Sequence, residues 1–203
     1  MAGLFERRCK ELRLEILGHQ SINVGQNEFK SLMTQIKGKN PDLVYFGGTT
    51  QSKGGQIAKD MVAAGLLCKL MVPDACMEKA FITSAGADNL NDRCYVTFGG
   101  LPPDQLQGAG KEFVEKYKKR FGNEPEAYAI YGYEAAKVVL EVIRRANKKD
   151  RAAIVAACAG IKDFDQGALG TWSFDANGDT SITTISGSKV HDGDFEFVKL
   201  LEE

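Results

Sequence analysis

The fold of this chain is decided by residues 27–72, which read NEFKSLMTQIKGKNPDLVYFGGTTQSKGGQIAKDMVAAGLLCKLMV. Apolar residues recur at helical spacing over residues 29–36, after a possible N-cap at Asn27. A short apolar run, LVYF at 43–46, follows and is closed by the glycine pair 47–48. This order predicts an amphipathic helix, then a buried strand, then a turn.

The same order repeats twice further along the chain. An amphipathic helix is expected over residues 57–64 with Gly65 as its C-terminal stop, and a strand over residues 69–72. A third helix is expected over residues 77–85 and a third strand over 95–98. Short apolar strands that alternate with helices predict an α/β fold, a parallel sheet covered by helices on both faces.

The pattern becomes wholly helical after Leu101-Pro102-Pro103, a natural place for the chain to pass into a second lobe. No strand is expected between the helices of this stretch. They are predicted over residues 113–121, 135–143 and 154–161.

The hydrophobic period changes to two from Leu169 onward, which is typical of strands. Trp172 and Phe174 precede an Asn177-Gly178 turn, and a second turn signal stands at Asp192-Gly193. The chain is therefore expected to close with short strands and hairpins.

The composition is that of a soluble globular protein, with 43% hydrophobic and 26% charged residues among 203. Lys and Arg are scattered and the net charge is -1, so we expect no nucleic-acid partner. No apolar run approaches the roughly 20 residues of a membrane-spanning helix, and the charged N-terminus, MAGLFERRCKELRLEIL, does not resemble a signal peptide.

The five cysteines are odd in number and show no CxxC or other short paired spacing. They indicate neither a zinc site nor a redox motif. We expect them to be mainly small buried hydrophobic residues that folding does not need. The sequence leaves one disulfide open, including whether Cys76 and Cys94 pair.

Two stretches that look like ligand loops fail on their spacing. Residues 47–55, GGTTQSKGG, resemble a phosphate loop, but Lys53 precedes the glycine where it should follow. Asp175 opens a calcium-loop spacing, but Thr180 stands where the glycine belongs and Ser186 where the glutamate belongs. A glycine turn and a hairpin turn explain these stretches. No nucleophile stands beside a base, so the sequence indicates no cofactor, no metal and no enzyme.

Polar residues follow two of the predicted strands. Thr49 lies in the glycine turn after residues 43–46, and Asp74 follows directly on residues 69–72 and Pro73. Both side chains are expected at the carboxyl ends of the strands, where open α/β sheets bind ligands. Two interpretations of Asp74 stay open, a carboxylate that pairs with a cation and an N-cap for the next helix.

The run INVGQNEFKSLMTQIKGKNPDLVYFGGTTQSKGGQIAKDMVAAGL, followed by VPDACMEKAF, YVTFGG, PEAYAIYGYEAAKVV and GTWSFDANGD, resembles the leucine, isoleucine and valine-binding proteins of bacterial ABC transporters. The order and spacing of these segments carry the resemblance, which covers nearly the whole chain. It implies a type I periplasmic binding protein, in which two α/β lobes joined by crossover strands close on an amino acid.

The resemblance also implies how the chain is divided. Residues 1–101 correspond to the α/β segment of the C-terminal lobe, a three-layer structure around a parallel sheet. Residues 102–162 correspond to helices that pack in the N-terminal lobe, and residues 163–203 return through the hinge to C-terminal-lobe strands. The sheet of the N-terminal lobe is missing, as is the first strand of the C-terminal lobe, so the chain looks like half a receptor.

The resemblance implies three ligand-binding residues. Thr49 maps to a residue that faces the ligand, Asp74 to the acidic residue that pairs with the α-ammonium group, and Tyr128 to an aromatic residue near the cleft. Family members tend to carry an aromatic residue at the position of Thr49 and a glutamate at that of Asp74. We therefore expect a wider pocket here.

The function implied is a solute-binding subunit, present as a fragment, which binds an amino acid and makes or breaks no bond. Its partner would be a membrane permease, and its place periplasmic or extracellular, although this chain shows no signal peptide. The alternatives are a ligand-sensing domain of the same fold and a fragment that no longer binds ligand. The helices at 113–121 and 135–143 would lack the sheet they cover, so self-association is also expected.

Overall fold

The computed structural model describes residues 1–201, which form two compact units. The first unit comprises Met1–Gly99 together with the segment from Ile185 onward. The second unit is Gly100–Thr184. The chain thus leaves the first unit after β3 and returns to it at β4.

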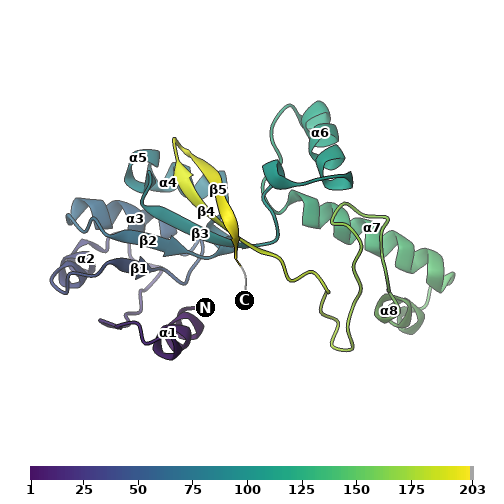
Figure 1. The fold of residues 1–203 in the computed structure, drawn as a ribbon, viewed down its shortest axis with the longest axis horizontal. Coiled ribbons are helices and arrows are strands. Elements are labelled where there is room, and N and C mark those ends of the chain that lie inside the picture. Colours follow the sequence, from purple (N-terminus) through teal and green to yellow (C-terminus); the bar gives the residue numbers. More distant parts are fainter. Residues whose placement is uncertain (202–203) are drawn as a thin grey trace. The chain divides into compact units, whose positions relative to one another are not determined.

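The first unit is built on a five-stranded sheet with the strand order β1-β2-β3-β4-β5 (Figure 1). Its first three strands are parallel, and the last two form an antiparallel hairpin beside β3. The strands are β1 (Leu43–Tyr45), β2 (Lys69–Val72), β3 (Cys94–Gly99), β4 (Ile185–His191) and β5 (Asp194–Leu201). The α/β fold with a parallel sheet and a C-terminal hairpin is therefore confirmed.

Helices of the first unit precede the first parallel strand and connect it to the next two, as the alternating pattern predicts. They are α1 (Ala2–Glu11), α2 (Lys30–Lys37), α3 (Gly54–Ala63), α4 (Lys79–Ala85) and α5 (Ala87–Leu90), with a 3-10 turn, η1 (Asp74–Cys76). Gly65 has a φ of +70°, consistent with its expected role in ending α3. Asn27 is not the N-cap of α2. Phe29 occupies that position, and its N–H donates to the buried carboxylate of Asp60 on α3 at 2.6 Å.

The two faces of the sheet are covered unequally. Side chains of β2 and β3 that alternate toward one face are buried, as are apolar residues of α3 and α4; the set includes Leu70, Val72, Cys94, Val96, Phe98, Ile57, Met61, Phe81 and Ile82. The opposite face carries α1, which lies on the side of β1 away from α2 and α3 (Figure 1). The Phe5 ring of α1 stacks on Tyr45 with centroids 4.0 Å apart.

Three helices occupy the stretch of the second unit for which the sequence predicts no strand. They are α6 (Ala109–Phe121), α7 (Ala129–Ala146) and α8 (Arg151–Ala159), preceded by a 3-10 turn, η2 (Pro103–Gln105). The strand expected around Trp172 and Phe174 is wrong. Only two isolated bridges form there, Phe164 with Trp172 and Phe174 with Thr180. Trp172 instead enters a core cluster with residues of α7 and the segment after α8, among them Val138, Val142, Ile161 and Phe164.

A buried carboxylate on α7 explains why this segment packs as a loop. Glu134 is 4% exposed and accepts hydrogen bonds from the Trp172 indole at 2.7 Å and the Ala168 N–H at 2.5 Å. A Cβ on Gly167 would lie 2.0 Å from the Glu134 carboxylate, so glycine is required at that close approach. Trp172 is therefore held by a specific hydrogen bond to a helix, which hydrophobic periodicity does not reveal.

Glu134→Ala is expected to destabilise the second unit by about 2 to 4 kcal/mol, because each buried donor left unpaired costs about 1 to 3 kcal/mol. Glu134→Gln keeps one acceptor oxygen and should lose about half as much. Trp172 is the only tryptophan of the chain, so its fluorescence during urea unfolding reports on this unit. Equal midpoints for the wild type and the alanine variant would show that Glu134 does not hold the loop.

All five cysteines are free thiols, among which Cys76 and Cys94 are fully buried. Burial raises the pKa of each of these two thiols to about 12, so both stay protonated and poorly reactive at neutral pH. The buried pair therefore serves as small core residues.

A reductant is expected to leave the melting temperature nearly unchanged, since no disulfide contributes to the fold. Thiol titration of the native chain should leave Cys76 and Cys94 unmodified until denaturant is added. A drop of many degrees on reduction would reveal a disulfide and contradict this account.

Candidate functional site

The turn after β1 positions Thr49 by mutual hydrogen bonds with a nearby serine. The Thr49 N–H donates to Ser52 Oγ at 2.6 Å, and the Ser52 N–H donates to Thr49 Oγ1 at 3.0 Å. Gly48 has no room for a side chain, since a Cβ there would lie 2.4 Å from the Phe46 ring. The glycine and the two hydroxyls thus fix a compact turn at the carboxyl end of β1.

The turn after β2 places Asp74 at the same edge of the sheet. Asp74 opens η1 directly after the buried Pro73, and its carbonyl accepts the Met77 N–H at 2.8 Å. Thr50 joins the two turns, because its N–H and its hydroxyl both donate to the Ala75 carbonyl at 3.4 Å. The structure therefore brings the turns that carry Thr49 and Asp74 side by side.

Asp74 does not occupy the N-cap position of the following helix. That position of α4 belongs to Glu78, and no side chain caps the helix. The 3-10 turn from Asp74 to Cys76 separates the strand from α4, so the carboxylate stands nearer the strand end than a cap would. Of the two interpretations left open by the sequence, the cap of α4 is wrong.

Tyr45 is a neighbour of Asp74 that the sequence reasoning missed. Its pKa is raised, first by burial and then by the negative charge of Asp74. The phenol stays protonated at neutral pH and is a potential hydrogen-bond donor at this edge. Its place at the end of β1, four residues before Thr49, is the signal that could have identified it.

Tyr128 belongs to the second unit, where it occupies the N-cap position of α7. Its side chain is 47% exposed, and its ring packs at a tilt against Tyr131 with centroids 6.2 Å apart. Thr49 and Asp74 thus lie at the carboxyl ends of neighbouring strands in the first unit, whereas Tyr128 lies in the second unit.

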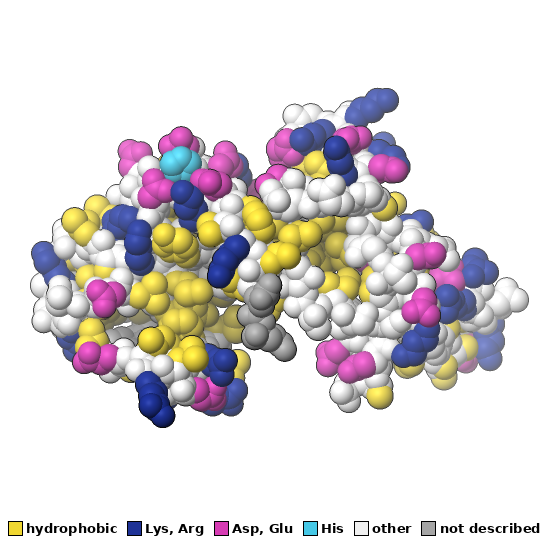
Figure 2. Space-filling model, viewed as in Figure 1, with side chains coloured by type: hydrophobic (Ala, Val, Ile, Leu, Met, Phe, Trp, Pro, Cys, Tyr) yellow, Lys and Arg dark blue, Asp and Glu magenta, His cyan; other side chains and the backbone are white. Residues whose placement is uncertain are grey.

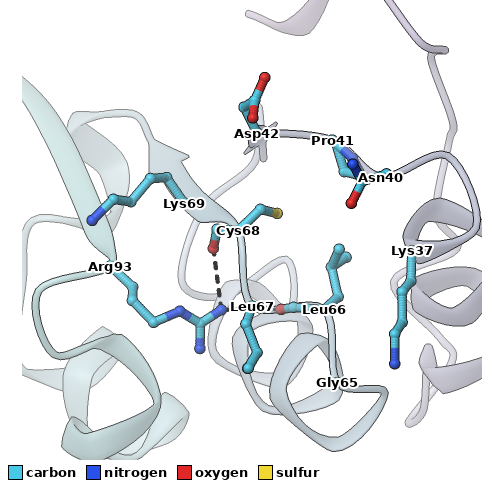
Figure 3. A pocket seen from close by; sticks show the side chains of 10 residues that line it. All are labelled: Lys37, Asn40, Pro41, Asp42, Gly65, Leu66, Leu67, Cys68, Lys69 and Arg93. Carbon is cyan, nitrogen blue, oxygen red and sulfur yellow. Dashed lines mark hydrogen bonds between the residues drawn. The ribbon is translucent and has the colours of Figure 1, made fainter.

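A pocket of the first unit, with a volume of about 470 Å³, opens at the amino ends of the strands (Figure 3). It is lined by the loops before β1, β2 and β3, including three cationic side chains. Lys37 donates to the Ala64 carbonyl at 3.1 Å, Lys69 to that of Asp92 at 2.8 Å, and Arg93 to those of Leu66 and Cys68 at 3.0 and 3.2 Å. These cations hold the loop carbonyls at the amino ends of the strands by hydrogen bonds. We therefore interpret the role of the three side chains as structural.

Metal chemistry finds no support in the described part of the chain. Residues 1–201 contain no group of three or more His, Cys, Asp or Glu side chains placed to hold a metal ion. The carboxylate of Asp175 accepts the N–H groups of Asn177 at 2.8 Å and Asp179 at 2.9 Å. A hairpin-type turn therefore occupies the stretch that has the opening spacing of a calcium loop.

Comparison with known protein families identifies the family to which this fold belongs. The model of the family described as periplasmic binding protein matches residues 1–194. This chain belongs to that family. Among curated members, an amino acid binding protein of Pseudomonas aeruginosa is 28% identical over 184 residues, and the match covers 90% of this chain and 47% of that protein. The Leu/Ile/Val-binding protein homolog 1 of Brucella suis is 26% identical over 205 residues, covering 98% and 53%.

Solved structures of the family share the fold. A leucine binding protein, LivK, of Thermotoga maritima matches with a TM-score of 0.88 and 25% identity, covering 99% of this chain and 56% of that one. The branched-chain amino acid binding protein LivJ of Streptococcus pneumoniae, solved with isoleucine, gives a TM-score of 0.86 at 22% identity, covering 100% and 56%. The family resemblance predicted from the sequence is confirmed. The chain spans about half the length of the relatives it matches.

Within residues 1–201, none of the helices is both long and apolar enough to cross a membrane.

Proposed function

We propose that this chain forms half of the amino-acid receptor of an ABC transporter, and that the receptor recognises a zwitterionic branched-chain amino acid. The proposal is supported by the family, by the names of the relatives, and above all by one observation: Thr49 and Asp74 end neighbouring parallel strands on turns joined by Thr50. Ligands of open α/β sheets bind at this edge.

Each proposed site residue has a distinct role in this function. The Asp74 carboxylate pairs with the α-ammonium group of the ligand, and the Thr49 hydroxyl faces the ligand from the neighbouring turn. Tyr128 supplies an aromatic surface from the second unit when the two lobes of the complete receptor close. Affinity comes from closure, and no bond is made or broken, so the receptor is not an enzyme.

The size of the two side chains favours a wide pocket. Threonine fills less space than an aromatic ring, and an aspartate carboxylate reaches less far than a glutamate carboxylate. We infer that the α-ammonium group binds close to the end of β2 and that the space beside Thr49 accepts the ligand side chain. The complete receptor would work outside the cytoplasm and deliver the amino acid to a membrane permease.

A fragment that no longer binds ligand is the second candidate, because the chain spans about half of its relatives. Calorimetric titration with leucine, isoleucine and valine separates the two. The chain alone should bind weakly or not at all, and the chain joined to an amino-terminal half of the relatives' length should bind tightly. Failure of the joined protein to bind any ligand would favour the second candidate, whereas binding of a ligand other than these three amino acids would indicate a ligand-sensing domain of the same fold.

Asp74→Asn in the joined protein is expected to weaken amino-acid binding about tenfold or more, because a charge-assisted hydrogen bond contributes roughly 1.5 to 3 kcal/mol. Asp42→Asn is the matched control, since Asp42 is an exposed carboxylate before β1 at the opposite edge. Equal calorimetric affinities for the Asp74 variant and the wild type would remove Asp74 from the site.

We also propose that the isolated chain self-associates through the second unit. A stripe of exposed apolar residues runs along α7, where Val139, Leu140 and Ile143 are 55%, 65% and 50% exposed. Gly132 and Ala136 continue the stripe toward the N-terminus of the helix and allow another helix to approach closely. Burying apolar surface contributes about 25 cal/mol per Å², which favours pairing of two copies in water.

Light scattering of the isolated chain at micromolar concentration should therefore report a dimer or larger species. Leu140→Glu should shift it toward the monomer, because a charge would enter the paired surface. Val155→Glu is the control, since Val155 is equally apolar and exposed on α8. A monomeric wild-type chain with native-like melting would contradict the proposal.

A further inference from the structure

A cationic cluster lies at the connection between α7 and α8. Asn147 ends α7 with a φ of +47°, and α8 begins at Arg151. The cationic cluster, residues 144–151 with the sequence RRANKKDR, contains five Lys and Arg side chains and one carboxylate. That carboxylate, Asp150, caps α8 by accepting the Ala153 N–H at 2.7 Å. The cluster therefore carries a strong positive charge on a short connection.

The five cations differ in how they are paired. Glu141 of α7, which is 4% exposed, accepts two hydrogen bonds from Arg144 and one from Arg145. The other three cations are exposed and take part in no ion pair among the described residues: Lys148, Lys149 and Arg151. These three unpaired cations can bind an anionic partner without breaking a contact that holds the fold.

The outer face of α8 is apolar. No charged residue lies between Ala152 and Ala159. The inner face of the helix packs against the core cluster of the second unit through Ile154, Ala157 and Cys158. The outer face is exposed and consists of Ala152, Val155, Ala156 and Ala159. Val155 is 61% exposed, so the second unit leaves this apolar face uncovered.

The cations and the apolar face of α8 lie side by side. Arg151 stands four residues before Val155, and residues four apart share one face of a helix. Figure 2 shows Lys and Arg side chains gathered at the end of the second unit where Figure 1 places the connection of α7 and α8. Both features therefore meet the solvent on one surface.

This surface is distinct from the apolar stripe of α7. The core cluster against which α8 packs includes Val138 and Val142, whereas the stripe is formed by Val139, Leu140 and Ile143. The two sets occupy different faces of α7. Pairing of two copies through the stripe would leave the outer face of α8 exposed.

A membrane surface with anionic lipids offers both kinds of contact. Headgroup phosphates attract Lys and Arg side chains, and the boundary of the acyl chains accepts the apolar face of a helix that lies in the plane of the interface. The outer face of α8 is too small to attach the chain by itself, and exposed charges alone are screened by salt. Attachment therefore needs the two together.

We propose that the cationic cluster and the outer face of α8 form a docking surface for a membrane that contains anionic lipids. The unpaired cations bind the headgroups, and Val155 points toward the acyl chains. A membrane is favoured over an acidic protein because it supplies an apolar layer directly beneath the negative charges. The surface contains none of the three proposed amino-acid-binding residues, so the proposed function and this inference can fail independently.

Co-sedimentation of the chain with vesicles tests the charged part of the surface. We expect binding to vesicles of phosphatidylglycerol that weakens as salt is added, and little binding to vesicles of phosphatidylcholine. Replacing both Lys148 and Lys149 by glutamine should weaken binding by about tenfold or more, because each cation near an anionic surface strengthens it about fivefold.

The matched control replaces Lys116 and Lys118 of α6 by glutamine. It removes the same charge from the same unit, but these two lysines are paired with Glu112 and Glu124. Binding should change little. An equal loss in both double variants would overturn the proposal, because attachment would then follow the net charge and not this surface.

Val155→Trp tests the apolar part of the surface. The new indole should enter the interface, so its fluorescence emission should shift to shorter wavelength when phosphatidylglycerol vesicles are added. Val198→Trp, at a position on β5 that is 48% exposed, is the control and should show no shift. Trp172 is 4% exposed and contributes a constant background to both variants.

Three results would overturn the proposal. They are an unshifted emission of the Val155 variant, equal binding to both kinds of vesicle, and failure of the wild-type chain to bind phosphatidylglycerol. Binding of polyglutamate that the Lys148 and Lys149 double variant loses, with no binding to vesicles, would assign the surface to an acidic protein instead.

Discussion

The parallel register of β1, β2 and β3 is the constraint on which the rest of the first unit depends. Tyr45 pairs with Met71, and Met71 pairs with Tyr95, so β1 and β2 end at the same side of the sheet while β3 continues to Gly99. Each strand must then return through a turn and a connecting segment, which places the turns of Thr49 and Asp74 next to each other. The same register leaves the loops before the strands at the other edge, where cationic side chains bind their carbonyls.

Much of this first unit could be predicted from the sequence because its strands and helices are short, apolar and separated by glycine or proline. The strand expected over residues 69–72 is β2, with the same bounds, since Pro73 ends it. The structure of the second unit could be predicted less well from the sequence. Trp172 and Phe174 alternate as strand residues do, but Trp172 is held by Glu134, a charged residue whose burial no periodicity predicts.

The positions of Thr49 and Asp74 could be predicted from the sequence because both residues follow the ends of strands. Residues whose placement depends on packing could not be predicted. Thr49 and Asp74 follow directly from the position of the turns after β1 and β2. Tyr45 was missed, because its stacking against Phe5 and the burial that raises its pKa depend on packing, which the sequence pattern does not reveal.

The central claim, that the carboxyl edge of β1 and β2 is the ligand edge, is tested most directly by amide chemical shifts of this chain during titration with millimolar leucine. We expect changes confined to residues 49–52 and 74–76, the two turns that Thr50 joins. Changes gathered at residues 65–69 around the opposite pocket would contradict the claim.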